Sequence, residues 1–231
     1  MDIICITGGT RPKLLEQTLS SMRENALDWS KHTLTLVLDN TPLPECAMAV
    51  PGFPMYILSR ESKGTSASRN IGASSIPKYR RQQYLMLVDD DTYLLPCWDF
   101  QLTRVLEALP GAVVSGHAHP FNHHIGVLEV GDVVAERAGV LSTVHLAMGW
   151  GVWDRVGFMK EPGGPGGSED VEWCARAVKL GYMLAVTRPM CAVHTGLTSS
   201  GGKQIVGYDL MVKLNQELVE EYSLSGKVVW E

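Results

Sequence analysis

The chain has few cysteines, and their arrangement excludes two kinds of protein. Among its 231 residues there are five, an odd number without a Cys-x-x-Cys pair, at Cys5, Cys46, Cys97, Cys174 and Cys191. Proteins held together by disulfides carry a dense, even set of cysteines, and cysteine zinc sites carry closely spaced pairs. We therefore expect reduced thiols, several of them packed as small hydrophobic groups within apolar runs.

Long apolar runs and a basic leader are also missing. No stretch approaches the ~18 consecutive apolar residues that a membrane-spanning helix needs, so we predict no membrane span. The N-terminal run MDIICITGG has neither the basic start nor the length of a secretory signal. The pattern indicates a cytoplasmic protein.

Clustered positive charge is scarce as well. The net charge is -5 and the pI about 5.8. The densest basic run, at 78–81, is short and is typical of a solvated loop. Nucleic acid is therefore a disfavoured partner. With 45% hydrophobic and 19% charged residues, the composition is that of an ordinary globular protein, and the length suits one large domain.

The first hundred residues alternate short apolar runs with helical patterns. The runs predict strands at 3–7, 34–38, 55–58 and 84–88, and the patterns predict helices at 12–26 and 65–76. Strands separated by helices indicate βαβ units. The fold class that follows is α/β, with a mostly parallel sheet.

The second half is less regular. It predicts a helix at 98–109, strands at 112–115, 127–130, 183–186 and 191–193, and a further helix at 207–222. The Gly-rich stretch at 163–167 can only form a loop. A helix follows it, with Ser168 as its cap, three acids in its first turn and Gly181 as its stop.

Two of the predicted strands end in acidic residues. Asp39 follows LTLVL, and Asp89, Asp90 and Asp91 follow YLMLV. Ligands of open α/β sheets bind outside the carboxyl ends of the strands. Adjacent carboxylates repel one another, and oxygen-only clusters of this kind suit Mg²⁺ or Mn²⁺. The alternative is a solvated acidic turn.

Read in order, a series of motifs resembles a known family. The motifs are Thr7-Gly8-Gly9-Thr10-Arg11-Pro12, Asp39, Lys63-Gly64, Ser68-Arg69-Asn70-Ile71-Gly72, LVDDDT, Gly149-Trp150-Gly151, Glu169-Asp170 and His194. Together they resemble the GT-A fold of family-2-like glycosyltransferases, over about residues 1–196. The resemblance implies a Rossmann-like, mixed but mostly parallel central sheet with helices on both faces.

The resemblance also implies a division of the chain. Residues 1–110 would form the nucleotide-binding half and 111–196 the acceptor half of one domain. Residues 197–231, as a loop and a helix, would pack on the same domain.

Binding of a nucleotide-sugar donor is implied for seven residues of these motifs. Asp39 would contact the base and Arg69 the nucleotide and diphosphate. The set is Thr7, Arg11, Asp39, Lys63, Arg69, Asp89 and Asp90. For Asp39 a turn-forming Asp-Asn is the competing interpretation.

A metal site and a catalytic pair are implied as well. Asp89, Asp91 and His194 would hold Mn²⁺ or Mg²⁺, which offsets the charge of a leaving diphosphate. Asp170 would be the general base for the acceptor hydroxyl, with Glu169 near the sugar or acceptor hydroxyls. The helix macrodipole favours an ionised Asp170. Ordinary charge complementarity at a helix start, and a packed or solvated His194, are the alternatives.

Sugar and acceptor contacts are implied for Gly149, Trp150 and Gly151, although Trp150 could equally be a core aromatic. The cluster His117, His119, His123 and His124 has no place in the resemblance. Imidazoles at this spacing can bind zinc, but we interpret the segment as an acceptor-side loop.

We thus expect an inverting, metal-dependent hexosyltransferase. It would move a sugar from a UDP- or GDP-sugar to a hydroxyl on a glycan, a small molecule or a modified nucleic acid. The alternatives are a nucleotide-sugar or glycan-binding module without catalysis, and a sugar nucleotidyltransferase. The second would carry a Gly-rich phosphate loop with a downstream Lys, which GGTRPK resembles only weakly.

Overall fold

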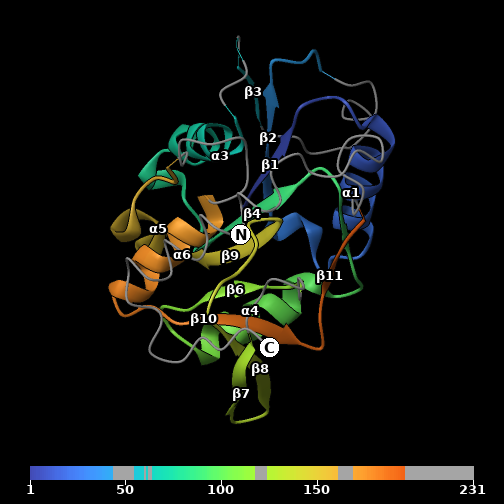
Figure 1. Ribbon diagram of the computed structural model, residues 1–231. Coiled ribbons are helices and arrows are strands. Elements are labelled where there is room, and N and C mark those ends of the chain that lie inside the picture. Colours follow the sequence, from blue (N-terminus) through green and yellow to red (C-terminus); the bar gives the residue numbers. More distant parts are fainter. Residues whose placement is uncertain (44–54, 60, 62–63, 118–123, 161–168, 196–231) are drawn as a thin grey trace, which may run out of the picture.

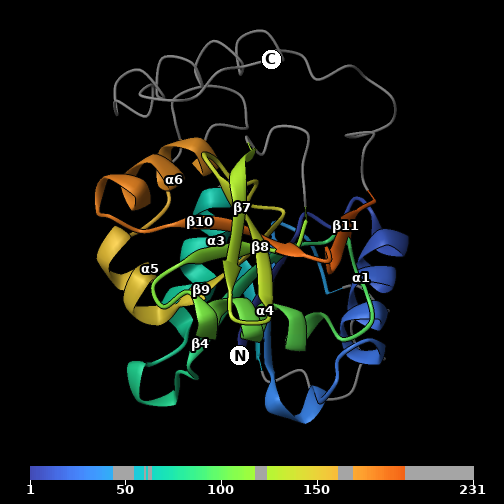
Figure 2. The same ribbon diagram turned by 90° about the horizontal axis from the view of Figure 1, so that it is seen from below.

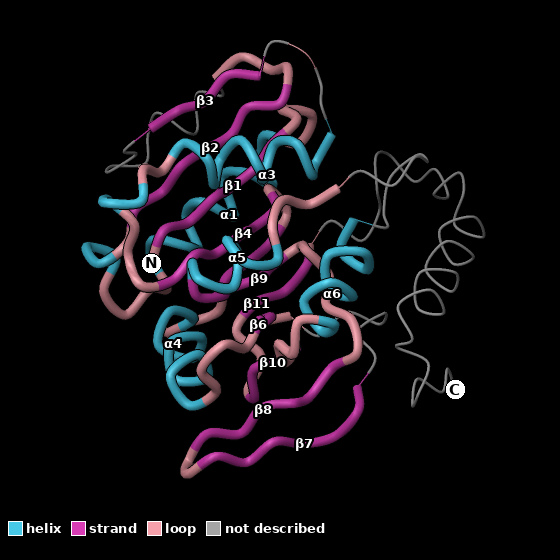
Figure 3. Tube along the Cα trace, turned by 90° about the vertical axis from the view of Figure 1, so that its left-hand side faces the viewer, coloured by secondary structure: helices cyan, strands magenta, loops and turns pink. Residues whose placement is uncertain are grey.

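A single large sheet organises the molecule (Figure 1). The computed structural model describes residues 1–43, 55–59, 61, 64–117, 124–160 and 169–195, with the backbone alone described at 55–59 and 124. Within this part of the chain, nine strands form one sheet in the order β3-β2-β1-β4-β9-β6-β10-β8-β7, and β11 and β5 form a small second sheet. Figure 3 shows the strands following one another in this order, with the β7–β8 hairpin at one end.

The strands of the large sheet are β1 (Asp2–Thr7), β2 (Thr33–Asp39), β3 (Met55–Ser59), β4 (Tyr84–Asp89), β6 (Val113–Ser115), β7 (His124–Val130), β8 (Val133–Ala138), β9 (His145–Gly149) and β10 (Leu184–Arg188). The small sheet joins β5 (Thr92–Leu94) to β11 (Ala192–His194) in antiparallel register. The helices are α1 (Pro12–Glu24), α3 (Gly64–Ser75), α4 (Trp98–Ala108), α5 (Trp150–Val156) and α6 (Glu169–Lys179).

The first four strands of the large sheet are parallel to one another. β1 pairs with β2 on one side and β4 on the other, and β2 pairs with β3. All six residues of β1 are buried, as is usual when helices cover both faces of a parallel sheet. The apolar runs of the sequence predict these strands to within one or two residues of their ends.

Helices cover both faces of the sheet, as predicted. One buried cluster includes Leu15 and Met22 of α1 and Trp98 of α4. The other includes Ala73 of α3 and Trp173 of α6, together with the tryptophans of α5. In Figure 2, α5 and α6 lie to the left of the sheet and α1 to its right. The expected class, a mixed α/β fold with helices on both faces, is confirmed.

The sequence pattern does not predict β5, β8, β9 or α5. Strand β5 spans three residues, and β9 runs directly into α5, so no turn residues mark a boundary between them. In β8 the exposed and buried residues do not alternate strictly. Antiparallel β9 lies between β4 and β6, so one sheet joins the two expected halves of the domain.

Two other expectations fall on parts that the structure does not describe. The Gly-rich loop at 163–167 and the helix at 207–222 lie outside the described residues, as does the whole segment 197–231. Within the described part, no helix is long and apolar enough to span a bilayer.

The packing of α3 on the sheet generates a prediction. A Cβ added at Gly72 would lie 2.4 Å from Ile4 Cγ2 and 3.0 Å from Val37 Cγ2. Both are β-branched side chains in buried strands and have little freedom to move away. Gly72→Ala should therefore lower the free energy of unfolding by about 1–3 kcal/mol, the usual cost of overpacking, as measured by urea denaturation.

The matched control for Gly72→Ala is Gly151→Ala in α5. A Cβ at Gly151 meets nothing within 4 Å, so this change should raise stability by up to ~1 kcal/mol through helix propensity alone. Equal effects of the two substitutions would contradict the close approach of α3 to β1 and β2.

Candidate active site

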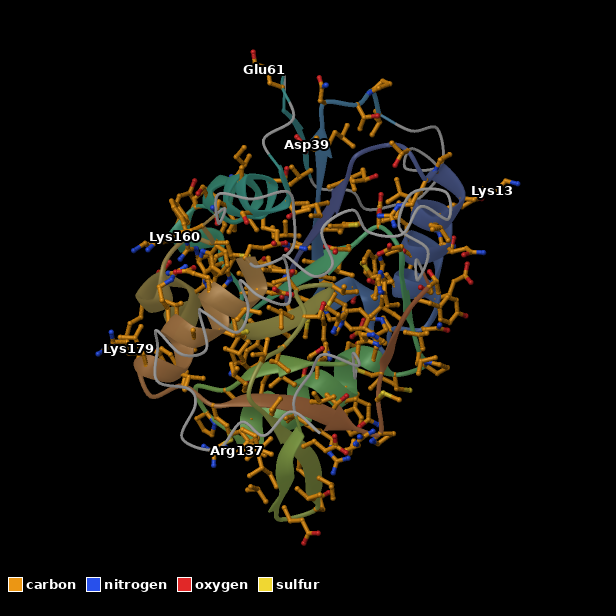
Figure 4. All side chains as sticks on the ribbon, viewed as in Figure 1. Lys13, Asp39, Glu61, Arg137, Lys160 and Lys179 are labelled. Carbon is orange, nitrogen blue, oxygen red and sulfur yellow. The ribbon has the colours of Figure 1, made fainter. Side chains whose placement is uncertain are left out.

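Parallel pairing brings polar strand ends together at one edge of the sheet. Thr7 ends β1, Asp39 ends β2 and Asp89 ends β4, and all three strands run in the same direction. Asp39 is labelled in Figure 4. Asp90 and Asp91 follow in the turn between β4 and β5. This edge carries the candidate site.

Two neighbouring carboxylates at this edge, Asp90 and Asp91, are held by Arg11. Its Nη2 lies 2.6 Å from Asp90 Oδ1, and its Nη1 donates to Asp91 Oδ2. Thr7 Oγ1 donates to the other Asp90 oxygen at 2.5 Å. Both carboxylates are buried. Burial raises the pKa of Asp90, and its hydrogen bonds from Thr7 and Arg11 do not fully offset this effect.

The third carboxylate, Asp89, is held by a second arginine. Arg69 of α3 is only 1% exposed. Its Nη2 lies 2.6 Å from Asp89 Oδ1, and its Nη1 lies 3.3 Å from Glu169 Oε1 at the start of α6. Thr65 Oγ1 donates to the same Glu169 oxygen at 2.9 Å. Arg69 therefore ties the end of β4 to the first turn of α6.

His194 reaches the acidic edge from the small sheet. Pairing of β11 with β5 sets His194 opposite Thr92, and its Nε2 lies 3.1 Å from Asp91 Oδ2. That hydrogen bond raises the pKa of His194. Burial opposes ionisation of Asp91, but the contacts with His194 and Arg11 outweigh it and lower the pKa of Asp91. The backbone N–H and the hydroxyl of Thr195 both donate to the Asp91 carbonyl, at 2.8 and 2.7 Å.

Glu169 and Asp170 begin α6 and differ in their ionisation. Burial works against the ionised form of Glu169, yet the Arg69 charge and hydrogen bonds from Thr65 and the backbone lower its pKa. For Asp170, burial and the charge of Glu169 raise the pKa to about 7. The Val171 N–H donates to Asp170 Oδ1 at 2.9 Å but does not reverse this. The helix amides favour the ionised form of Asp170, as expected, but burial and the Glu169 charge have the larger effect on its pKa.

A cavity of about 300 Å³ opens at this edge of the sheet, lined by Ile6, Thr7, Gly8, Arg11, Asp39, Gly64, Thr65, Ser68, Asp89 and Asp90. Six of the residues expected to bind the donor are described, and five of them line it: Thr7, Arg11, Asp39, Asp89 and Asp90. The sixth, Arg69, contacts its wall through Asp89. Lys63, the seventh, lies outside the described residues.

The expected metal ligands are only partly assembled. Asp91 and His194 lie together, and Asp91 Oδ1 is buried with no hydrogen-bond partner in the part of the chain that the structure describes. Asp89, the third expected ligand, is bound to Arg69, and within the described residues no three His, Cys, Asp or Glu side chains are arranged to hold an ion. The three-residue metal set therefore stays a prediction, and two of its members, Asp91 and His194, are in contact here. Their oxygen and imidazole donors fit a divalent cation that takes its other ligands from outside the protein.

Trp150 and its neighbours lie at the opposite edge of the sheet. Gly149 pairs with Tyr84, at the start of β4, and five strand steps separate Tyr84 from Asp89, or ~16 Å. Trp150 is buried; its Nε1 donates to Asp2 Oδ2 at 2.8 Å, and the Arg81 Cζ stacks 3.9 Å from its ring. Gly149, Trp150 and Gly151 thus lie apart from the acidic edge, and their expected contact with the sugar or acceptor stays a prediction.

The histidine cluster is described only in part. His119 and His123 lie outside the described residues, and of His124 only the backbone is described. The His117 ring lies 6.1 Å from the His194 ring, edge to face. The cluster as a whole stays uninterpreted.

Two residues, Thr65 and Thr195, contribute to the site without any signal in the sequence pattern, and Ser68 belongs to a motif but has no role assigned to it there. Thr65 holds Glu169, Thr195 holds the Asp91 carbonyl, and Ser68 lines the cavity with a buried hydroxyl that has no hydrogen-bond partner among the described residues. A small polar residue in a helix or after a strand is too common to be singled out without the contacts.

The buried position of Arg69 generates a prediction. Arg69→Gln leaves Asp89 and Glu169 without their cation, and breaking a buried ion pair in this way costs about 3–5 kcal/mol. We expect a loss of that size in the free energy of unfolding, measured with guanidinium chloride at pH 7. Arg104→Gln is the matched control, because Arg104 pairs with Asp132, whose side chain is 91% exposed; its loss should cost less than ~1 kcal/mol. Comparable losses for both variants would contradict a structural role for Arg69.

Comparison with known proteins places the fold. No protein-family model matches the chain, and no curated protein is similar to it in sequence. Among solved structures, GalNAc-T7 with UDP, GalNAc and Mn²⁺ superposes with a TM-score of 0.73 at 13% identity, over 96% of this chain and 48% of that one. TarS of S. aureus superposes with a TM-score of 0.65 at 11% identity, over 97% of this chain and 39% of that one. The chain spans less than half the length of either, and the likeness shows that it has the GT-A glycosyltransferase fold.

Proposed function

We propose that this chain transfers a sugar from a nucleoside-diphosphate sugar to a hydroxyl acceptor, with a divalent cation and with inversion at the anomeric carbon. The observation that carries the proposal is the meeting of two acidic groups beside one cavity. One is the Asp89–Asp91 turn, the other is the Glu169–Asp170 pair, and Arg69 joins them. The GT-A fold supports the same reaction class, and one neighbour was solved with UDP, GalNAc and Mn²⁺.

The donor's nucleoside suits the cavity at the ends of β1, β2 and β4. Its lining includes the carboxylates of Asp39, Asp89 and Asp90, which accept hydrogen bonds from ribose hydroxyls and base N–H groups. Gly8 and Gly64 leave room for a ligand close to the backbone. UDP and GDP are the nucleotides that we propose, with Asp39 at the base.

Asp91 and His194 would hold the cation, Mn²⁺ or Mg²⁺. When bound, the cation supplies neutralisation of the charge that develops on the leaving diphosphate. Asp91 is held in place through its backbone as well as its carboxylate, because Thr195 donates two hydrogen bonds to the Asp91 carbonyl. Arg69 and Thr65 anchor Glu169. We therefore propose that Glu169 is a positioning residue, which orients Asp170 and the sugar hydroxyls.

Asp170 is the proposed general base. A carboxyl group with a pKa near 7 matches its task at neutral pH, since an efficient base titrates close to the working pH. It would accept the acceptor's proton as the acceptor oxygen bonds to the anomeric carbon and the diphosphate departs. A single displacement of this kind inverts the configuration. The acceptor is a hydroxyl compound that we leave open between a glycan, a small molecule and a modified nucleic acid.

The proposal is tested by incubating the chain with UDP- and GDP-sugars, with Mn²⁺ or with EDTA, and measuring release of the nucleoside diphosphate. We expect release that depends on Mn²⁺ and is stimulated by a sugar acceptor. Binding of the donor without release would favour a non-catalytic module. Release of pyrophosphate from a nucleoside triphosphate and a sugar phosphate would favour a nucleotidyltransferase.

The metal site generates a prediction for Asp91 and His194. Asp91→Asn removes a charged ligand and should abolish the Mn²⁺-dependent part of nucleotide binding and of turnover. His194→Ala removes a neutral one and should raise the Mn²⁺ concentration for half-maximal rate by about 10- to 100-fold, with little change in the melting temperature. Mn²⁺ titrations of donor turnover measure both effects. Full activity of the parent chain in excess EDTA, or an unchanged titration for His194→Ala, would contradict this site.

The position of Asp170 generates a second prediction. Asp170→Asn should lower kcat by ~10²–10⁴-fold and leave donor binding nearly intact, because the nucleotide contacts lie elsewhere. In the parent chain kcat/KM should rise with pH through about 7, where Asp170 ionises. This limb should be absent from the variant. NMR of the product from an α-linked donor should show a β-linkage, and an α-linkage would rule out this role.

Two controls separate catalysis from folding. Since burial raises the pKa of Asp170 above its value in the unfolded chain, ionisation lowers stability as the pH rises from ~4 to 7. Asp170→Asn should accordingly melt at a higher temperature than the parent at pH 8. Glu172→Gln, in the same helical turn but paired with Arg176, should change stability while keeping the pH profile of the rate.

A further inference from the structure

The two arginines of the acidic edge are held in different ways. Arg69 is 1% exposed and lies within α3, between two acids. The Arg11 side chain is 32% exposed and bridges Asp90 and Asp91 from the loop before α1. One guanidinium is part of the core, and the other reaches the carboxylates from the cavity side.

The backbone of Arg11 is fixed while its side chain has no role in the helix. The Arg11 carbonyl accepts the Leu15 N–H at 3.1 Å, which anchors the residue at the start of α1. No side-chain hydrogen bond caps the helix there. Gly9 just before it adopts a φ of +72°, a turn that glycine makes without strain. The side chain can therefore leave its carboxylates without unfolding α1.

Arg11 and His194 meet on the same oxygen, Asp91 Oδ2. A divalent cation bound by Asp91 and His194 needs that carboxylate, and it repels a guanidinium in direct contact with the same group. Arg11 and the cation therefore compete for Asp91. An arginine released at this point lies beside the cavity, where a diphosphate accepts a bidentate pair of hydrogen bonds from it.

We infer that the Arg11 guanidinium serves as a positive counter-ion that belongs to the protein itself. It neutralises Asp90 and Asp91 in the unliganded protein, and it turns to the donor's diphosphate when Mn²⁺ binds Asp91. This inference rests on the proposed function and adds that binding of the cation and binding of the nucleotide are coupled through Arg11. Mn²⁺ alone must displace Arg11 without compensation, whereas Mn²⁺ with a nucleoside diphosphate gives Arg11 a new partner. The cation and the nucleotide should therefore strengthen each other's binding, by the same factor in both directions.

The test is a titration of the full chain with Mn²⁺, alone and with saturating UDP or GDP, followed by electron paramagnetic resonance of free Mn²⁺ and by calorimetry. Arg11→Gln should bind Mn²⁺ alone about tenfold more tightly than the parent, the scale of one charge-assisted hydrogen bond. The gain in Mn²⁺ affinity on adding the nucleotide should shrink by a similar factor. At saturating Mn²⁺, UDP or GDP should bind more weakly to this variant than to the parent, because the diphosphate then lacks the Arg11 contact.

Arg23→Gln is the matched control for net charge. Arg23 lies on α1 beside Glu24, twelve residues or ~18 Å along the helix from Arg11, where its charge is screened. It should leave all the Mn²⁺ constants unchanged. Arg11→Lys, which keeps the charge but cannot bridge two carboxylates bidentately, should give intermediate values and covers the case in which Arg11→Gln does not fold.

The outcomes separate this inference from the proposed function. Unchanged or weaker binding of Mn²⁺ alone by Arg11→Gln and Arg11→Lys would overturn the inference, even with sugar transfer intact in the parent. Equal tightening by Arg23→Gln would reduce the effect to net charge and would overturn it too. If the parent binds no Mn²⁺ with either nucleotide, the proposed metal site and the inference both fail.

Discussion

The structure depends on holding five carboxyl groups close together at one end of a buried sheet. Asp89, Asp90 and Asp91 follow β4, and Glu169 and Asp170 begin α6. Like charges at this spacing are costly in a protein interior. Arg11 and Arg69 reduce the cost by contacting four of the five groups. The fifth, Asp170, has no ion-pair partner within the described residues, and burial and the Glu169 charge raise its pKa to about 7.

The same constraint connects segments that are distant in the sequence. Arg69 brings α6 against β4, and His194 brings β11 against the turn after β4. Without Arg69, the first turn of α6 would present Glu169 and Asp170 to Asp89 with no intervening cation. The fold therefore sets the geometry of the site, and the site's charge balance in turn holds two elements of the fold in place.

The sequence predicts the first half of the fold better than the second. Runs such as YLMLV carry a strong apolar signal because β1, β2 and β4 are buried on both faces. Strand β9 runs directly into α5, and β8 belongs to a hairpin that is partly exposed, so neither has a clear boundary or period in the sequence. Their places in the sheet follow from pairing with β4 and β10, which is set by residues distant in the sequence.

The site shows a similar division. Motif order predicts which acids and which histidine converge, because strand ends and helix starts meet at one edge. It does not predict that Arg69 pairs with Glu169, one hundred residues away, or that Asp2 and Arg81 bind Trp150 at the far edge. A helix start indicates an ionised acid at Asp170, and only the packing reveals the burial that raises its pKa. Charge balance is thus the property of this site that sequence patterns miss. It also supports the proposal that a diphosphate would bind here together with a cation, because an anion that enters an edge rich in carboxylates is repelled unless positive charge arrives with it.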